Sequence, residues 1–392
     1  MAHMIAEPIY DETLVPAYTL PDPLAPFPDG SAITVEEWRN VRRREIRNLF
    51  AEHVYGRTPR KGPAIAFRII ESSRDALGGK AVRKQVQAVL RGNGQTRTLN
   101  LLVYIPAQRD GPAPSFIGLN FQGNQTIHPD PDIRAGDAQT DAAPRGSRTD
   151  RWPLEAIVDQ GFALVTLHCN DLFPDHPQGR AAGIAPLFPQ DDVQAPDAWG
   201  AIGMWAWGLS RVLDYCAADP DLDATRVAVV GHSRLGKAAL WAGAQDQRFA
   251  LVISNNSGCG GAAISRRRFG ETVAAINQGF PHWFCPRFHT YSDREDALPV
   301  DQHMLLALTA PRPLYVASAQ DDLWADPRGE YLSAFHATPV YGLLGHTGLT
   351  SEAMPPVNQP VGSRIGYHIR SGPHEITAYD WAQYLRFAAK HR

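Results

Sequence analysis

The spacing of apolar residues predicts different elements in the first and the later parts of the chain. The range 5–30 is rich in proline and has few periodic apolar positions, so we expect an extended arm over the surface. Thr34 and Glu37 form a capping-box pattern that opens a helix reaching about Val54. Mixed polar and apolar positions then predict strands exposed on one face near residues 64–71, 81–91 and 98–105.

Short apolar runs alternate with helical patterns in the rest of the chain. The predicted buried strands are Ser115–Phe121, Phe162–Cys169, Val227–Val230, Leu251–Ser254 and Leu314–Ala317. The helical segments fall near residues 152–160, 197–217, 235–245, 302–308 and 327–335. This alternation predicts an α/β fold, a mostly parallel central sheet with helices on both faces. We expect a single domain over residues 1–392, with loop insertions around a cleft within 122–195.

Composition excludes several classes of protein. Hydrophobic residues make up 44% and charged residues 20% of the 392 positions, which is typical of a chain with a large core. Lys and Arg number 38 against 41 Asp and Glu, and this balance argues against a nucleic-acid partner. No run of about 18 apolar residues predicts a membrane span. The four cysteines have no zinc-ligand spacing, so we expect neither a metal site nor a disulfide scaffold.

The stretch Arg226–Lys237 contains the candidate nucleophile. β-branched residues end at Gly231, Ser233 follows two positions later, and a helical pattern begins at Leu235. A strand, a tight turn and a helix together lift a serine hydroxyl above the sheet, and the helix N-terminus directs N–H groups towards an anionic intermediate. The glycine of the G-x-S-x-G pattern falls one position late, at Gly236, so the prediction depends on the whole strand–turn–helix context.

A serine nucleophile needs a general base and an acid that orients the base. His374 lies in the loop between the strand-like Gly366–Arg370 and a helix near 378–390, which is where the base belongs. His368, the rival, lies inside that strand, which favours a packing or hydrogen-bonding role. Asp322 is the best-placed acid because it comes a few residues after the strand Leu314–Ala317.

Two other carboxylates in the same loop remain alternatives for the acid. Asp321 precedes Asp322, and Asp326 precedes Pro327, where it can cap the following helix.

Seven motifs of the chain belong together: Gly231–Lys237, Asn255–Ala263, Phe280–Phe284, Leu298–His303, Ala310–Pro313, Trp324–Pro327 and Gly366–Arg370. With these motifs the chain resembles the glucuronoyl esterases of carbohydrate esterase family 15, bacterial type, in the α/β-hydrolase superfamily. The resemblance spans about residues 100–390. It implies an α/β-hydrolase that needs no cofactor and cleaves esters between 4-O-methyl-glucuronic acid on xylan and alcohols of lignin.

The resemblance also implies roles for individual residues. Ser233 is the nucleophile and His374 the base, and Arg234 donates to the oxyanion through its backbone N–H and guanidinium. Lys237, Glu271 and Trp324 bind the uronate. Taken alone, Arg234 fits a surface ion pair and Lys237 a solvated helix face. Glu271 alone fits a carboxylate at a helix start, and Trp324 alone fits a packing aromatic.

Two positions depart from the fungal members of the family. Those members place the triad's acid, a glutamate, where this chain has Asn256, so Asp322 is expected to supply the acid. They also carry a disulfide-bonded cysteine where this chain has His232, so that bridge cannot form here.

The predicted function is a serine esterase acting on glucuronoyl esters. The alternatives are an acetyl-xylan or general carboxylesterase on the same scaffold and, from another class, a catalytically silent carbohydrate-binding protein. The expected partner is glucuronoxylan or a lignin–carbohydrate ester, with no nucleic acid and no membrane, and a monomer is expected. The first residues show no signal peptide, so a secreted or periplasmic location is inferred from the polymeric substrate alone.

Overall fold

The computed structural model describes residues 7–135, 143–189 and 192–391. The predicted insertions at 122–195 therefore include two segments, 136–142 and 190–191, that lie outside the described residues, as do the first two residues of the predicted arm.

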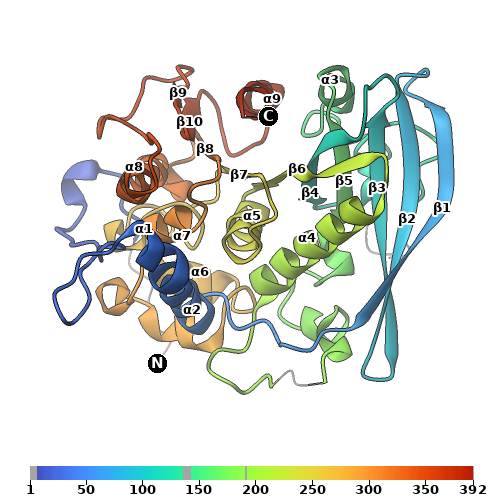
Figure 1. Cartoon of the computed structure of the whole chain (residues 1–392). Coiled ribbons are helices and arrows are strands. Elements are labelled where there is room, and N and C mark those ends of the chain that lie inside the picture. Colours follow the sequence, from blue (N-terminus) through green and yellow to red (C-terminus); the bar gives the residue numbers. More distant parts are fainter. Residues whose placement is uncertain (1–6, 136–142, 190–191, 392) are drawn as a thin grey trace.

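Ten strands of the described chain join one sheet in the order β1-β2-β3-β5-β4-β6-β7-β8-β10-β9 (Figure 1). The six central strands, from β5 to β10 in this order, run parallel, whereas β1 to β3 and β9 pair in the antiparallel sense at the two edges. The strands are β1 Ala64–Ala76, β2 Ala81–Gly92, β3 Gln95–Pro106, β4 Ala113–Asn120, β5 Ala163–His168, β6 Leu222–His232, β7 Leu251–Asn255, β8 Leu314–Ala319, β9 Val361–Gly362 and β10 Ile365–Arg370.

Helices cover both faces of this sheet (Figure 1). Helices α4, α5 and α8 contact one face, and α3 and α9 contact the other. In β6, Val227 and Val229 belong to one core cluster and Ala228 and Val230 to the other, which is the two-sided burial that the apolar run predicted. The helices are α1 Val35–Glu37, α2 Arg43–His53, α3 Leu154–Asp159, α4 Ala201–Ala218, α5 Arg234–Gln245, α6 Val273–Gly279, α7 Gln302–Ala307, α8 Pro327–Leu343 and α9 Ala378–Lys390.

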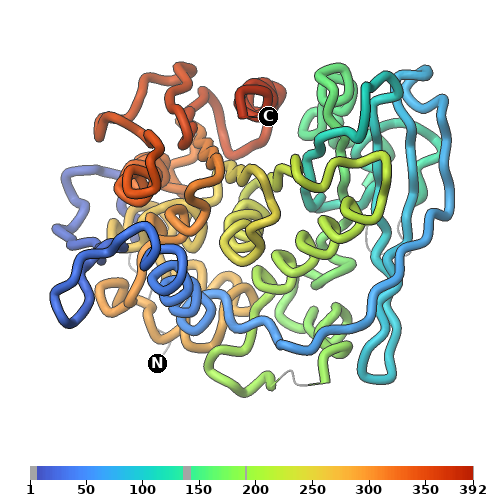
Figure 2. Tube along the Cα trace, viewed as in Figure 1, coloured from blue at the N-terminus to red at the C-terminus, as the bar shows by residue number. Residues whose placement is uncertain are grey.

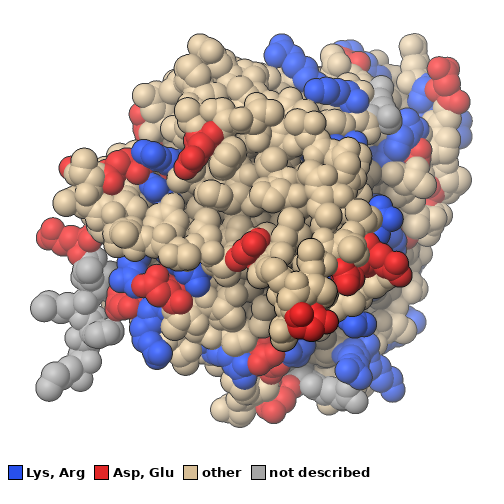
Figure 3. Space-filling view, turned by 60° about the vertical axis from the view of Figure 1, so that its left-hand side comes forward, with Lys and Arg blue, Asp and Glu red and all other residues tan. Residues whose placement is uncertain are grey.

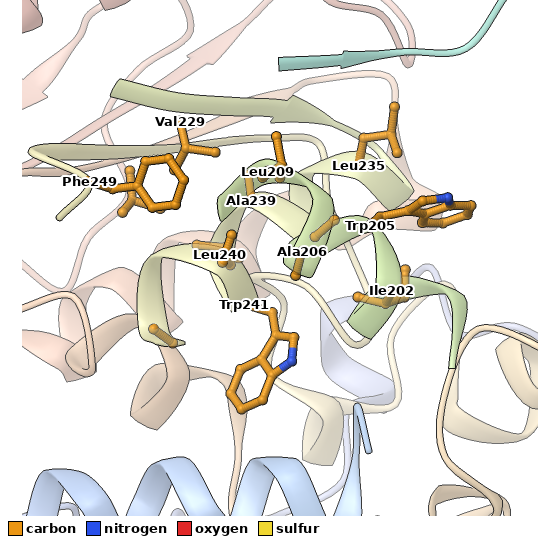
Figure 4. Close-up of a cluster of buried hydrophobic side chains, with 14 of the residues drawn as sticks. Ile202, Trp205, Ala206, Leu209, Val229, Leu235, Ala239, Leu240, Trp241 and Phe249 are labelled. Carbon is orange, nitrogen blue, oxygen red and sulfur yellow. The ribbon is translucent and has the colours of Figure 1, made fainter. Parts of the chain in front are cut away.

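The core beneath the candidate nucleophile is built from α4 and α5 (Figure 4). Both helices are apolar on most of their circumference, because each lies between the sheet and a further layer of chain. Trp241 of α5 points away from the sheet towards α2, and its ring centroid is 6.5 Å from that of Phe50. Such close packing makes α5 a rigid support for the residues at its N-terminus.

Several elements differ from the sequence-based expectations. Helix α8 continues to Leu343, past Pro339 and past the predicted end near residue 335, and α6 was not predicted. Strand β2 was expected to expose one face, but Arg83 and Lys84 are buried there. Arg83 pairs with Glu71 and two aspartates, and Lys84 pairs with Asp219 and Asp221. Because these charges are paired, the two basic residues can be buried in β2. Within 122–195, α3 and β5 belong to the layers of the fold, and the other described residues form loops and short 3₁₀ turns.

The described part of the N-terminal arm lies against the segment 266–270 (Figure 2). The Gly270 N–H donates to the Ile9 carbonyl over 2.9 Å, and Arg267 donates to Glu12 over 2.7 Å. Farther along, His303 Nε2 lies 2.8 Å from the Pro21 carbonyl oxygen. The arm is thus held by specific polar contacts to residues near the candidate site.

Charged side chains of both signs are interspersed at the margins of the face in Figure 3, and the middle of that face carries few of them. This distribution agrees with the small net charge of −3. Among the described helices, none combines the length and the apolar character that crossing a membrane requires.

Candidate active site

Ser233 occupies a sharp turn between β6 and α5. Strand β6 ends at His232 and α5 begins at Arg234, as the sequence predicted. Ser233 has φ 57° and ψ −130°, a conformation that non-glycine residues rarely adopt and that is typical of functional turns. The turn also needs glycine at Gly231, because a Cβ there would lie 2.0 Å from the Leu235 carbonyl oxygen.

His374 and Asp322 form a close pair in two loops at the carboxyl edge of the sheet. His374 Nδ1 lies 2.5 Å from Asp322 Oδ2, and the Asn256 amide donates to the same oxygen over 2.9 Å. Burial would raise the pKa of Asp322, but hydrogen bonds from His374 and Asn256 hold that pKa below its ordinary value. An ionised Asp322 can therefore orient the imidazole and stabilise its protonated form.

The rival residues have other surroundings. Asp321 is exposed, and Asp326 caps α8 by accepting from the Gly329 N–H over 2.9 Å, as its position before Pro327 suggested. His368 is fully buried in β10, with Nε2 2.9 Å from Asp380 and Nδ1 3.0 Å from the Tyr315 hydroxyl. These contacts give His368 the hydrogen-bonding environment expected of a structural histidine.

One pocket of about 350 Å³ brings together all seven residues proposed from the sequence. Ser233 lies at the elbow, and the side chains beside it come from α5, from the segment before α6 and from the loops after β8 and β10. The pocket-lining residues that were proposed are Ser233, Arg234, Lys237, Glu271, Asp322, Trp324 and His374.

Lys237 and Glu271 form a buried ion pair in this pocket. Lys237 Nζ lies 3.9 Å from Glu271 Oε2 and also donates to the Ser257 carbonyl. Burial lowers the pKa of Lys237 and raises that of Glu271, and each charge partly offsets the effect on the other. Trp324, which is 42% exposed, hydrogen-bonds to Glu271. The cluster supplies one cationic donor and one acceptor, the combination that sugar hydroxyls require.

Arg234 begins α5, so its own N–H and that of Leu235 have no acceptor within the helix. Donors of this kind stabilise an oxyanion when they face the reacting carbonyl. Arg234 lines the pocket, and its guanidinium donates to Asp175, a partner that the sequence did not indicate.

Other residues of the site were missed by the sequence analysis. Trp283 and Phe280 line the pocket, and only their place in the motif Phe280–Phe284 could have indicated this. The His232 ring centroid is 4.6 Å from that of His374, and burial together with the charge of His374 lowers the pKa of His232 to about 3, which keeps this ring neutral.

A buried carboxyl group supports one wall of the pocket. Glu330 accepts from the N–H groups of Ser257 and Gly258 and from the Ser318 hydroxyl, over 2.7, 3.0 and 2.7 Å. Burial raises the pKa of Glu330 to about 8. Its contacts fix the loop that presents Asn256 to Asp322.

The described residues include no group of three or more His, Cys, Asp or Glu side chains arranged to hold a metal ion. The four cysteines lie within the described ranges and are buried, and no disulfide joins any of them there.

Comparisons with known proteins show which family the chain is similar to. The family model described as "Glucuronyl esterase, fungi" matches residues 122–345. The structure of a promiscuous CE15 esterase from a marine bacterial metagenome is 46% identical, with a TM-score of 0.91 over 98% of this chain and 100% of that one. A glucuronoyl esterase from Solibacter usitatus is 44% identical, with a TM-score of 0.89 over 97% and 99% of the two chains.

Among curated relatives, a 4-O-methyl-glucuronoyl methylesterase from Podospora anserina is 39% identical over 321 residues, which are 79% of this chain and 56% of the relative. The family match, the identity over nearly the whole length of two solved chains and the mostly parallel sheet lead to one conclusion. The chain belongs to the glucuronoyl esterase family, carbohydrate esterase family 15, and is a carboxylic ester hydrolase with the α/β-hydrolase fold.

Proposed function

We propose that the protein hydrolyses esters of (4-O-methyl-)glucuronic acid, such as those that join lignin to glucuronoxylan, through an acyl-enzyme on Ser233. The observation that carries this proposal is the single pocket that holds the elbow serine, the His374–Asp322 pair and the buried Lys237–Glu271 pair.

In the proposed mechanism, Ser233 Oγ attacks the ester carbonyl while His374 accepts the hydroxyl proton. The N–H groups at the start of α5 and the Arg234 guanidinium stabilise the negative charge on the carbonyl oxygen, a contribution typically worth about 10²–10³ in rate per donor. His374 then gives the proton to the leaving alcohol. Water, deprotonated by His374, attacks the acyl-enzyme and releases the uronate, and the proton returns to Ser233.

Specificity for the uronate is assigned to Lys237, Glu271 and Trp324. A buried charged pair is costly to maintain unless a ligand or the fold compensates its desolvation. Hydroxyl groups of a sugar can donate to Glu271 and accept from Lys237, which an acetyl group cannot do.

A broader carboxylesterase is the second candidate function. The observation that favours it is the 46% identity to an esterase described as promiscuous. The shared fold and catalytic residues do not separate the two candidates, since substrate choice depends on the pocket.

The test compares benzyl glucuronate, methyl glucuronate and p-nitrophenyl acetate as substrates, with Ser233→Ala as the control. We expect turnover of the glucuronate esters and its loss in Ser233→Ala. Turnover of acetate without glucuronate would overturn the specificity and leave the general esterase. No turnover of any ester would leave the silent carbohydrate-binding protein.

We further propose that the chain is a single domain and acts as a monomer on glucuronoxylan or a lignin–carbohydrate ester, secreted or in the periplasm. The reason for the location is the size of such a polymer, which cannot enter a cell. Light scattering coupled to gel filtration measures the mass directly, and a dimer mass would refute the monomer.

A further inference from the structure

Asp175 lies behind the pocket wall, in the loop that follows β5. Its backbone N–H donates to Asn170 Oδ1 over 3.2 Å, which holds the loop at this point. The side chain is 17% exposed and does not line the pocket. The proposed reaction gives Asp175 no role.

Three donors converge on this one carboxylate. Oδ2 accepts from Arg234 Nη1, while Oδ1 lies 2.8 Å from His282 Nε2 and accepts from Trp283 Nε1 over 2.7 Å. Arg234 belongs to α5, whereas His282 and Trp283 belong to the loop after α6. Asp175 therefore joins two walls of the pocket that are far apart in the sequence.

The charge of Asp175 is maintained by these contacts. Burial would raise its pKa, but the hydrogen bonds from His282 and Trp283 and the charge of Arg234 lower it to about 2. The carboxylate is thus ionised at any pH at which a serine esterase with a histidine base works.

Arg234 has little else that would fix its direction. Its guanidinium carbon lies 4.9 Å from the Trp283 ring centroid, 5.6 Å from that of Phe121 and 5.7 Å from that of Phe280. Its Nε is buried and has no hydrogen-bond partner within the described part of the chain. Aromatic faces attract a guanidinium without fixing the direction of its N–H groups. A carboxylate fixes both the position of the guanidinium and the direction of its N–H groups.

We propose that Asp175 is a positioning residue that holds the Arg234 guanidinium in its oxyanion-stabilising place and, through its other oxygen, holds Trp283 as the wall against which Arg234 lies. The inference rests on the proposed function, because it takes the role of Arg234 from that mechanism. Asp175 touches neither the reacting atoms nor the substrate in this arrangement.

The Asp175→Asn variant tests the charge with almost no change in shape. The asparagine amide has one oxygen and one NH₂ group. Either Arg234 or the His282–Trp283 pair would therefore face an NH₂ donor where it now faces a carboxylate oxygen. We expect kcat for benzyl glucuronate to fall by about 10–100-fold, since a small misplacement of a catalytic group can cost about 10²-fold. KM should change by less than about threefold, because an oxyanion donor acts mainly in the transition state.

A double-mutant cycle with Arg234→Ala separates positioning from general stability. If Asp175 acts through Arg234, Asp175→Asn should change kcat by less than about twofold in the Arg234→Ala background. An equal loss in both backgrounds, or an unchanged kcat in the single variant, would overturn the inference. Asp175→Glu keeps the charge and should have a higher kcat than Asp175→Asn. If the two variants lower kcat equally, the charge does not position Arg234.

Asp130→Asn is the matched control. Asp130 is also largely buried, at 12% side-chain exposure, and it accepts from Arg83 and from the Tyr104 hydroxyl. None of these three residues lines the pocket. It should lower stability while leaving kcat unchanged. If the wild-type chain fails to cleave any glucuronate ester, the proposed function fails. If it cleaves them and the cycle is additive, only the inference about Asp175 fails.

Discussion

Replacing Asp322 by asparagine should remove most of the esterase activity. The substitution keeps the size of the side chain but removes the charge that faces His374 Nδ1 across 2.5 Å. It also changes the hydrogen-bond pattern, because Asn256 donates to the same oxygen over 2.9 Å. The new side chain places either its amide oxygen or its NH₂ group at the Oδ2 position, which faces both His374 and Asn256. An oxygen there still accepts from both side chains but carries no charge, whereas an NH₂ group there meets the Asn256 donor and favours the wrong imidazole tautomer.

The expected loss follows from the charge and the tautomer. Unit charges about 4 Å apart interact by about 4 kcal/mol at an effective dielectric constant of about 20. The His374 side chain is 42% exposed, so solvent screening reduces the interaction, and we take about 3 kcal/mol. That energy corresponds to about 10² in kcat, and the inverted tautomer extends the loss towards about 10⁴.

The assay is kcat for benzyl glucuronate at neutral pH, with Asp321→Asn as the matched control. Asp321 is the neighbouring residue, is exposed and should tolerate the same change with nearly full activity. If Asp322→Asn retains more than about a tenth of the wild-type kcat, the electrostatic argument is wrong. Another group would then orient His374.

Lys237→Ala should raise KM for glucuronate esters by about 10–100-fold and leave KM for p-nitrophenyl acetate unchanged. The expected change in KM corresponds to the loss of about 1.5–3 kcal/mol, which is typical of a hydrogen bond from a charged group. An equal effect on both substrates would remove Lys237 and its partner Glu271 from uronate recognition. Gly231→Ala should destabilise the fold by about 1–3 kcal/mol and reduce activity, because the new Cβ would meet the Leu235 carbonyl oxygen at 2.0 Å. Urea unfolding measures the loss, and wild-type stability would show that the turn can relax. The lowered pKa of Asp175, about 2, means that its contribution to stability is present above its unfolded pKa and is lost as the pH falls from about 4 to 2. Urea unfolding at several pH values should therefore show a smaller loss over this window for Asp175→Asn than for wild type, and parallel curves would contradict the assignment.

Local sequence signals predicted the layers of the fold and the turn at Ser233. Strands β4 to β8 each appear as short apolar runs because parallel strands are buried on both faces, and each run matched a strand of the sheet. Strand β2 was predicted with one exposed face because Arg83 and Lys84 resemble solvent-facing residues. Their burial depends on carboxylates from other parts of the chain, such as Asp130 and Asp219, and no local pattern encodes such pairing.

The sequence by itself determined the strand–turn–helix at Ser233 and the loops that carry Asp322 and His374, because each depends on residues within a few positions. Only the tertiary structure decided which charges meet: His374 with Asp322 and Asn256, and Arg234 with Asp175. The physical reason is that a side-chain contact depends on the order of strands in the sheet and on the paths of loops between them. Asp175 and Arg234 are 59 residues apart, and they meet only because β5 and β6 flank β4.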